Sequence, residues 1–235
     1  MTHLKRLDDI LLSQNVAKEF KIGMNNTEFA DWLIGCIPEI RDCANLNQDN
    51  PWHIYNCLEH ILKTVEEMNK QTIGLKKEQR RLLAYVMFYH DMGKPATQSR
   101  RFSEVYDREI DSFFNHNIKS AEIVRSSAKN FEFNDEEINQ IEKLVLEHDM
   151  FMFITEEEDF NPYHNVLSEE LIKDKIKELS QVGDGQQLML YLVMIGRADN
   201  KAQNPKMTER SLKLLDKIET MTKDISHFAN DKQLQ

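Results

Sequence analysis

Apolar residues recur at steps of three and four along most of the chain, which is the spacing of one face of an α-helix. The pattern predicts amphipathic helices over residues 4–17, 28–37, 51–68, 76–90, 108–128, 168–181, 185–201 and 208–228. Asn134 and Glu137 have the spacing of a capping pair and predict the start of one more helix. The segment 100–109 lacks a clean period, and we expect a charged loop there.

Turn-forming residues are few. The 235 residues include only 7 glycines and 5 prolines, which is little turn chemistry for a fold of many strands. Apolar residues make up 40% of the chain, enough for a substantial core. We therefore predict an all-α fold, with a single helical domain that carries extensions.

Several polar residues interrupt the predicted apolar faces. Asp199 follows Leu188, Leu192 and Ile195 at helical spacing, so a carboxylate takes the fourth place in a core stripe. A buried, unpaired carboxylate costs several kcal/mol, so this residue needs a cation, a metal ion or hydrogen-bond donors. The residues on or beside such faces are His60, His90, Asp91, His116, His148 and Asp199.

Imidazole and carboxylate groups are ligands for divalent metals, and helical bundles build metal centres from inward side chains of several helices. Taken alone, each histidine also fits a hydrogen-bonded core residue, and Asp199 also fits an ion pair with Arg197. His53 and His60 stand two turns, about 10 Å, apart on the predicted helix from Pro51, too far to bind one ion.

The net charge and the cysteine content limit which partners and which cellular compartment we expect. A net charge of -10 argues against a broad nucleic-acid surface, although RNA is not excluded and Lys94, Arg100 and Arg101 form a local basic cluster for phosphate. The three cysteines lack metal-ligand spacing and predict free thiols in the cytoplasm. We expect no signal peptide and no membrane span, because the most apolar stretch, residues 188–196, is too short. No feature indicates an oligomeric state.

Three short segments carry a family resemblance: EHIL at 59–62, YHDMGKP at 89–95 and GRADNKAQ at 196–203. Their order resembles the HD superfamily of metal-dependent phosphohydrolases. Residues 37–62 and 113–124 are similar, more narrowly, to the HD region of bacterial tRNA nucleotidyltransferases, the CCA-adding enzymes. The resemblance implies an HD-domain helical bundle over residues 37–205, with an N-terminal helical extension at 1–36 and a C-terminal helix at 206–235.

The resemblance also implies roles for individual residues. His60, His90, Asp91 and Asp199 match ligands of one divalent metal, and His116 and His148 match ligands of a second ion bridged by Asp91. The expected ions are Mn, Fe, Ni, Co, Mg or Zn. Lys94 matches a lysine that faces substrate phosphate, and His53 matches a substrate-side position, with Arg100 and Arg101 as further candidates. Asp149 matches no ligand position and is expected to be an ordinary exposed or capping acid.

The implied function is hydrolysis of a small phosphorylated substrate by metal-activated water, with Asp91 and Lys94 as catalytic residues. Candidate substrates are a nucleotide, a cyclic nucleotide or a 2′,3′-cyclic phosphate. Before Ile37 the sequence lacks the Gly-Ser turn and paired carboxylates of a nucleotidyltransferase head, so we expect no nucleotide addition. The alternatives are a di-iron HD-type oxygenase and a non-catalytic module that binds a nucleotide or RNA.

Overall fold

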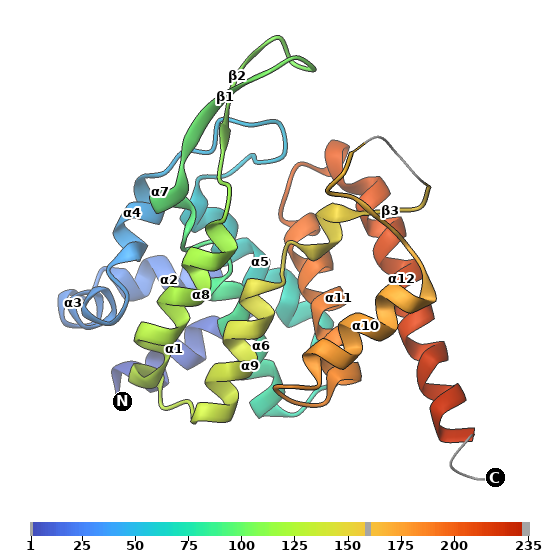
Figure 1. Cartoon of the computed structure of the whole chain (residues 1–235). Helices are drawn as coiled ribbons and strands as arrows, with labels where there is room; N and C mark the ends of the chain where they lie inside the picture. Colours follow the sequence, from blue (N-terminus) through green and yellow to red (C-terminus); the bar gives the residue numbers. More distant parts are fainter. Residues whose placement is uncertain (1, 158–160, 232–235) are drawn as a thin grey trace.

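The computed structural model describes residues 2–157 and 161–231, with side chains up to residue 225. It is mostly helical, which confirms the predicted all-α class (Figure 1). The helices are α1 (His3–Leu11), α2 (Val16–Met24), α3 (Thr27–Cys36), α4 (Glu39–Asn45), α5 (Cys57–Gln71), α6 (Lys77–Tyr89), α7 (Lys94–Thr97), α8 (His116–Ser127), α9 (Asp135–Leu146), α10 (Glu169–Leu179), α11 (Gly185–Lys201) and α12 (Pro205–Asp231).

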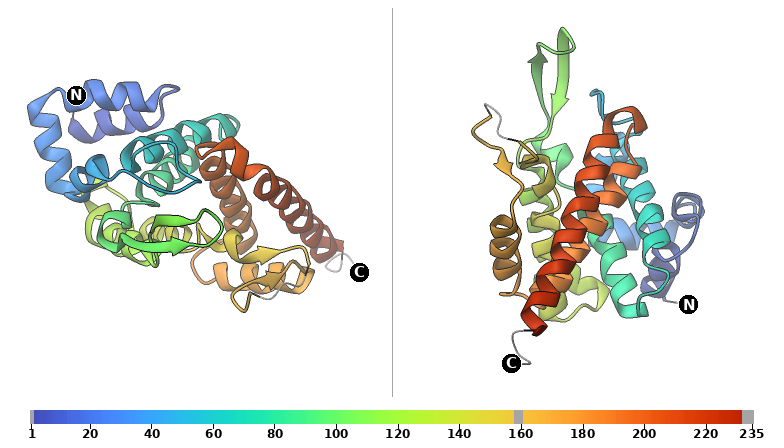
Figure 2. Two further views of the ribbon diagram at one scale, coloured as in Figure 1. Left: turned by 90° about the horizontal axis from the view of Figure 1, so that it is seen from above. Right: turned by 90° about the vertical axis from the view of Figure 1, so that its right-hand side faces the viewer.

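The central helices α5, α6, α8, α9 and α11 enclose the main core. Their buried faces carry the predicted stripes, so Ile61 of α5, Val86 of α6, Val145 of α9 and Leu192 of α11 are fully excluded from solvent. Seen from above, the N-terminal helices and α12 lie on opposite sides of this centre (Figure 2). The core therefore joins segments that are far apart in the sequence.

The N-terminal region differs from its prediction, because residues 4–17 contain nearly all of α1, a break, and the first two residues of α2. The break between α1 and α2 is held by Asn69 of α5, whose Nδ2 donates to the carbonyl oxygens of Leu11 and Ser13, both at 2.8 Å. Asp8 of α1 accepts hydrogen bonds from Arg81 and Tyr85 of α6, each at 2.9 Å. These contacts fix the N-terminal helices to the core.

The start of α5 also differs from its prediction. The helix begins at Cys57, because Asn56 accepts a hydrogen bond from the backbone N–H of Glu59 at 2.8 Å and caps the first turn. Upstream, Oδ1 of Asn50 accepts from the backbone N–H groups of Trp52 and His53, both at 3.2 Å, and holds a turn. The predicted helix from Pro51 is therefore wrong, and His53 lies outside α5.

The segment predicted as a loop is a β-hairpin of strands β1 (Ser99–Ser103) and β2 (Arg108–Ser112), which projects beyond the helices (Figure 1). The predicted helix over 108–128 therefore starts eight residues late, at His116, after Asn115 with a left-handed φ of 63°. The two strands pair through charged residues, such as Arg100 opposite Asp111, and these residues show neither a helical nor a strand period in the sequence.

Other helices match their predicted positions. α11 spans Gly185–Lys201 as expected, and α9 opens with the capping box of Asn134 and Glu137. After α9 the chain forms a 3₁₀ turn over Met150–Phe153 and a short parallel pair of β3 (Ile154–Thr155) and β4 (Asn165–Val166). No helix in the described ranges combines the length and apolar character needed to cross a bilayer.

Candidate metal centre

Six predicted ligands converge in the middle of the helical core, although they come from different elements. His60 lies in the first turn of α5, His90 and Asp91 follow α6, His116 begins α8, His148 follows α9 and Asp199 lies near the end of α11. Their ligand atoms form two sets whose members lie within 4.8 Å of one another: His60, His90 and Asp199; and Asp91, His116 and His148.

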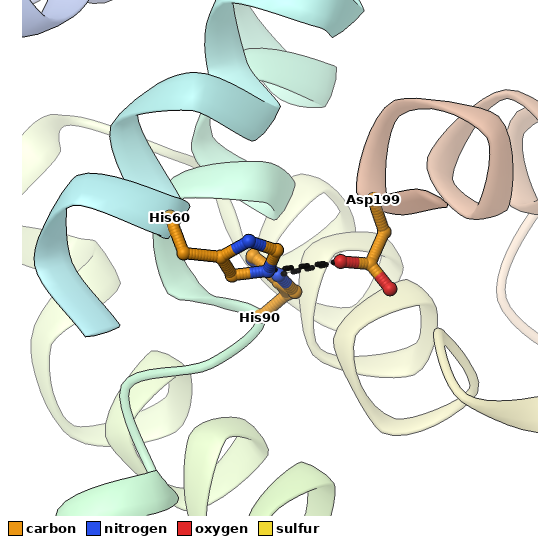
Figure 3. Close-up of side chains that lie close together, drawn as sticks. All are labelled: His60, His90 and Asp199. Atoms are coloured by element: carbon orange, nitrogen blue, oxygen red, sulfur yellow. Dashed lines mark ion pairs between the residues drawn. The ribbon is translucent and has the colours of Figure 1, made fainter. Parts of the chain in front are cut away.

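The first set surrounds one point between α5, α6 and α11 (Figure 3). Nε2 of His60 lies 2.9 Å from Oδ1 of Asp199, and Nε2 of His90 lies 3.8 Å from the same oxygen. Oδ2 of Asp91 lies 3.2 Å from Nε2 of His60 and 3.3 Å from Nε2 of His90. Two imidazole nitrogens and two carboxylate oxygens therefore face one another.

The second set uses the other oxygen of the same carboxylate. Oδ1 of Asp91 lies 3.2 Å from Nε2 of His116 and 3.8 Å from Nε2 of His148. The two imidazole nitrogens of this set are 3.2 Å apart. Asp91 consequently stands between the two sets, with one oxygen directed to each.

Each of these imidazoles is oriented by a backbone carbonyl. Nδ1 of His90 lies 2.6 Å from the carbonyl oxygen of Met87, and Nδ1 of His148 lies 2.6 Å from that of Val145. The corresponding distance is 2.8 Å from His116 to Phe113 and 3.4 Å from His60 to Ala202. When Nδ1–H donates to a carbonyl, Nε2 keeps its lone pair, which is the tautomer that binds metals.

The pKa values of His60 and His90 depend on the neighbouring carboxylates. Burial lowers the pKa of His60, but Asp199 and Asp91 outweigh it and raise that pKa to about 9. The pKa of His90 also rises to about 9, because Asp91 and Asp199 outweigh its burial. Although burial opposes the shift, the histidines and Lys94 lower the pKa of Asp91 well below its usual value. The carboxylates thus attract positive charge to the centre.

The geometry fits a metal ion better than a hydrogen-bond network. Nε2 of His60 and Nε2 of His90 are buried without a hydrogen-bond partner among the described residues, even though carboxylate oxygens lie within 3.3 Å. Two ligands bound at about 2.0–2.2 Å to one ion lie about 3.0–3.5 Å apart. Most distances within each set fall in or near this range, so the six residues fit one or two divalent ions.

Lys94 lies beside the metal centre and is almost fully buried. Its Nζ is 2.6 Å from Oδ2 of Asp91, 2.9 Å from Oε1 of Gln48 and 3.2 Å from Nε2 of His53. Burial and Lys94 together lower the pKa of His53, so this imidazole is neutral. Sequence reasoning placed His53 about 10 Å from His60, but their ring centroids are 5.0 Å apart because His53 precedes the helix.

Arg100 and Arg101, the other predicted substrate residues, lie on β1 of the projecting hairpin. The Arg100 guanidinium donates to Oδ2 of Asp49 at 3.2 Å and to the carbonyl oxygen of Glu109 at 3.2 Å. Arg101 is exposed on the same strand. The six ligand residues are not among the described contacts of either arginine. Their role in substrate binding remains a prediction.

Asp149 lies beside the second set of candidate ligands, a position that sequence reasoning did not predict. Its carboxylate lies 3.2 Å from Nε2 of His116 and 3.3 Å from Nε2 of His148, and its side chain is only 18% exposed. Its carboxylate also makes no capping hydrogen bond to the 3₁₀ turn that follows, so the expectation of an ordinary exposed or capping acid is wrong. The sequence does carry a signal, because the letters HDM at residues 90–92 recur at 148–150, each time after an apolar stripe. Helical periodicity could not place Asp149, because α9 ends at Leu146.

The turn after the His-Asp pair packs tightly against α8. The backbone N–H of Gly93 donates to Oγ of Ser120 at 2.9 Å, and a Cβ at Gly93 would lie 2.2 Å from the carbonyl oxygen of His116. Behind the same turn, the thiols of Cys57 and Cys43 lie 3.6 and 3.9 Å from the carbonyl oxygens of Asp91 and Met92. Close backbone approach thus joins the two sets of ligands.

Comparison with known proteins agrees with this geometry. The family model described as HD domain matches residues 53–221, a span that includes all six converging residues, Lys94 and His53. No curated protein matches the chain. Because the matched span covers well over half of the sequence, the chain belongs to the HD domain family.

Proposed function

We propose that the chain is a metal-dependent phosphohydrolase that acts on a nucleotide, a cyclic nucleotide or a 2′,3′-cyclic phosphate. The observation that carries this proposal is the position of Asp91, whose two oxygens face two separate pairs of histidines. A carboxylate shared in this way suits a pair of neighbouring divalent ions, which is a common arrangement for phosphoester hydrolysis.

In this proposal His60, His90, Asp91 and Asp199 hold the first ion, and Asp91, His116 and His148 hold the second. The mixed nitrogen and oxygen ligands suit Mn, Fe, Ni, Co or Zn, and Mg where oxygen ligands dominate. A bound ion supplies Lewis acidity, which activates water and neutralises charge on the phosphoryl oxygens.

The protein itself positions the Asp91 carboxylate and balances its negative charge. Lys94 holds Oδ2 of Asp91 at 2.6 Å, so the bridging carboxylate is oriented before any ligand binds. Gln48 and neutral His53 accept hydrogen bonds from the same ammonium and fix its position. Lys94 is a buried cation beside the proposed metal centre, and we assign it to a non-reacting phosphoryl oxygen, which would replace Gln48 or His53 as an acceptor.

A nucleotide-like substrate is supported by an aromatic pair next to His53 in the chain. Trp52 directly precedes His53 and is 37% exposed, and Tyr106 of the hairpin packs edge-on against it with ring centroids 6.2 Å apart. Asn204, just after α11, donates its backbone N–H to the Trp52 carbonyl oxygen at 2.8 Å. The resemblance of residues 37–62 and 113–124 to the HD region of tRNA nucleotidyltransferases suits the same substrate class, while the family match itself gives the HD domain alone.

The test is turnover by metal-loaded protein on a panel of nucleotides, cyclic nucleotides, 2′,3′-cyclic phosphates and model phosphodiesters. We expect hydrolysis with at least one of Mn²⁺, Ni²⁺, Co²⁺, Fe²⁺ or Mg²⁺, and loss of that activity in Asp91→Asn. An absence of turnover with every ion would refute the proposal. Turnover that requires dioxygen would instead favour an oxygenase, and metal-independent nucleotide affinity would favour a binding module.

A further inference from the structure

Asp149 directly follows His148 and lies at the start of the 3₁₀ turn after α9, where it faces the second set of ligands. Its Oδ2 lies 3.2 Å from Nε2 of His116, and its Oδ1 lies 3.3 Å from Nε2 of His148. Both carboxylate oxygens are thus aimed at imidazole nitrogens, one on each side of the same small space.

The neighbouring acid behaves differently. Glu147 is about as buried as Asp149, but it accepts from Lys143 at 2.9 Å and from Lys175 at 2.8 Å, in ordinary ion pairs with lysines. Asp149 has no lysine or arginine within ion-pair distance among the described residues, and only the two histidines lie that close. Within the part of the chain that the structure describes, the groups that face its charge are therefore those of the second set.

The atoms around this space are all acceptors when the histidines are neutral. His116 and His148 direct Nδ1 to the carbonyl oxygens of Phe113 and Val145, so each Nε2 presents a lone pair. Those two nitrogens are 3.2 Å apart, and they also meet oxygens of Asp91 and Asp149. Four acceptors at such distances repel one another unless a cation lies between them.

The spacing agrees with a shared ion. The neighbouring donor atoms of this set are separated by 3.2, 3.2, 3.2, 3.3 and 3.8 Å. Ligands bound to one ion at about 2.0–2.2 Å are separated by about 3.0–3.5 Å, so four of these five distances fit a common centre. The fifth, between His148 and Asp91, exceeds the range slightly.

We propose that Asp149 is a protein ligand of the second ion and the counterpart of Asp199 at the first. Each ion then has two histidines, one oxygen of Asp91 and one terminal carboxylate. Three carboxylates offset three of the four positive charges of two divalent ions. The proposal rests on the two-ion centre proposed above, but it does not depend on which reaction that centre catalyses.

The experiment counts and measures bound ions. Protein stripped with a chelator is reloaded with Mn²⁺ and desalted, and the ions per chain are measured by plasma mass spectrometry and their affinities by titration calorimetry. The variants are Asp149→Asn, which preserves shape, Asp149→Ala, Asp199→Asn, and Asp174→Asn as a matched control at an exposed acid of α10. Circular dichroism of each stripped protein verifies the fold.

We expect two ions in the wild-type protein and in Asp174→Asn. Asp149→Asn should keep the first ion with unchanged affinity and bind the second at least about tenfold more weakly, with loss of Mn–Mn exchange coupling in the electron paramagnetic resonance spectrum. Asp199→Asn should weaken the other ion. The proposal is overturned if Asp149→Asn and Asp149→Ala keep two ions with wild-type affinities, or if the wild-type chain takes up a single ion. A two-ion pattern in a protein that hydrolyses no substrate would refute the hydrolase function and still support Asp149 as a ligand.

Discussion

Nζ of Lys94 lies 2.6 Å from Oδ2 of Asp91, the oxygen that also faces His60 and His90. The lysine side chain is only 6% exposed and the aspartate 2%, so this pair is shielded from solvent. The Lys94 ammonium is therefore a fixed positive charge next to side chains that could hold metal ions.

Replacement of this lysine should make folding more dependent on metal. In Lys94→Met, the buried Asp91 loses its nearest cation, and breaking such a pair costs about 3–5 kcal/mol. We expect the metal-free variant to unfold at a much lower temperature than the metal-free wild type, and Mn²⁺ to raise its Tm by more. Thermal unfolding with and without chelator measures both effects. Lys18→Met, at an exposed lysine of α2, should leave both Tm values unchanged.

The stability of the metal-free protein should depend on pH in a defined window. The pKa values of His60 and His90 are raised to about 9, so the stability they add is complete below the unfolded-state value of about 6.5 and is lost as pH rises to about 9. Asp91 and Asp199 have lowered pKa values, so their contribution is lost only in acid, below about pH 4. Chemical unfolding of chelator-treated protein between pH 5 and 10 should therefore show a decline above about pH 6.5.

The same histidines should make metal affinity pH dependent. Each protonated imidazole must release its proton before Nε2 can bind an ion. Affinity for Mn²⁺ should therefore rise from about pH 6 to about pH 9, and calorimetry in buffers of different ionisation enthalpy should detect proton release. Affinity that is flat over this interval would contradict the raised pKa values.

Gly93 should tolerate no side chain, because of space rather than backbone conformation. Its φ is -77°, which any residue adopts, but a Cβ would lie 2.2 Å from the His116 carbonyl oxygen and 2.7 Å from the backbone nitrogen of Ser120. Overpacking typically costs about 1–3 kcal/mol, and here both neighbours are backbone atoms, so we expect at least that loss in Gly93→Ala.

Gly93→Ala should also move His116 and weaken the binding of the second ion, which metal analysis can measure. Gly35→Ala is the matched control, because a Cβ at this exposed position of α3 meets no atom within 4 Å. That substitution should leave stability unchanged or raise it by up to about 1 kcal/mol, since alanine favours a helix. Equal effects of the two substitutions would disprove the packing argument.

Trp52 should contribute to substrate affinity if the substrate carries a base. Stacking of a base on an aromatic ring is worth about 1–3 kcal/mol, so Trp52→Ala should raise KM about tenfold and change kcat little. Trp52→Phe should retain most of the affinity. The control is Ile73→Ala, at an apolar residue that is 70% exposed beyond the far end of α5. A substrate without a base should show no difference between these variants.

The sequence predicted the helical stripes from local spacing. The six candidate ligands followed from their places on or beside these stripes, and their joint role came from the resemblance to HD phosphohydrolases. Asp199 illustrates this, since its place after Leu188, Leu192 and Ile195 marked it as a buried carboxylate, and it meets His60 in the core. Residues outside regular helix were harder to place. His53 looked two turns from His60 until the Asn56 cap showed that α5 begins after it.

The hairpin and Asp149 were missed for a related reason. The strands of the hairpin are set by pairing between segments, such as Arg100 opposite Asp111, which no single-segment period records. Asp149 lies in a turn after α9, and its approach to His116 depends on how α8 and α9 pack. Contacts of this kind are determined by tertiary structure and not by local sequence.

The ligands of the metal centre are drawn from positions 60 to 199, so no short fragment of the chain holds them all. During synthesis, the first ion cannot acquire its complete ligand set until Asp199 has left the ribosome and α11 has packed beside α5 and α6. An ion held by His60, His90 and Asp199 would therefore be taken up late, and its presence would report that most of the chain has reached its native topology.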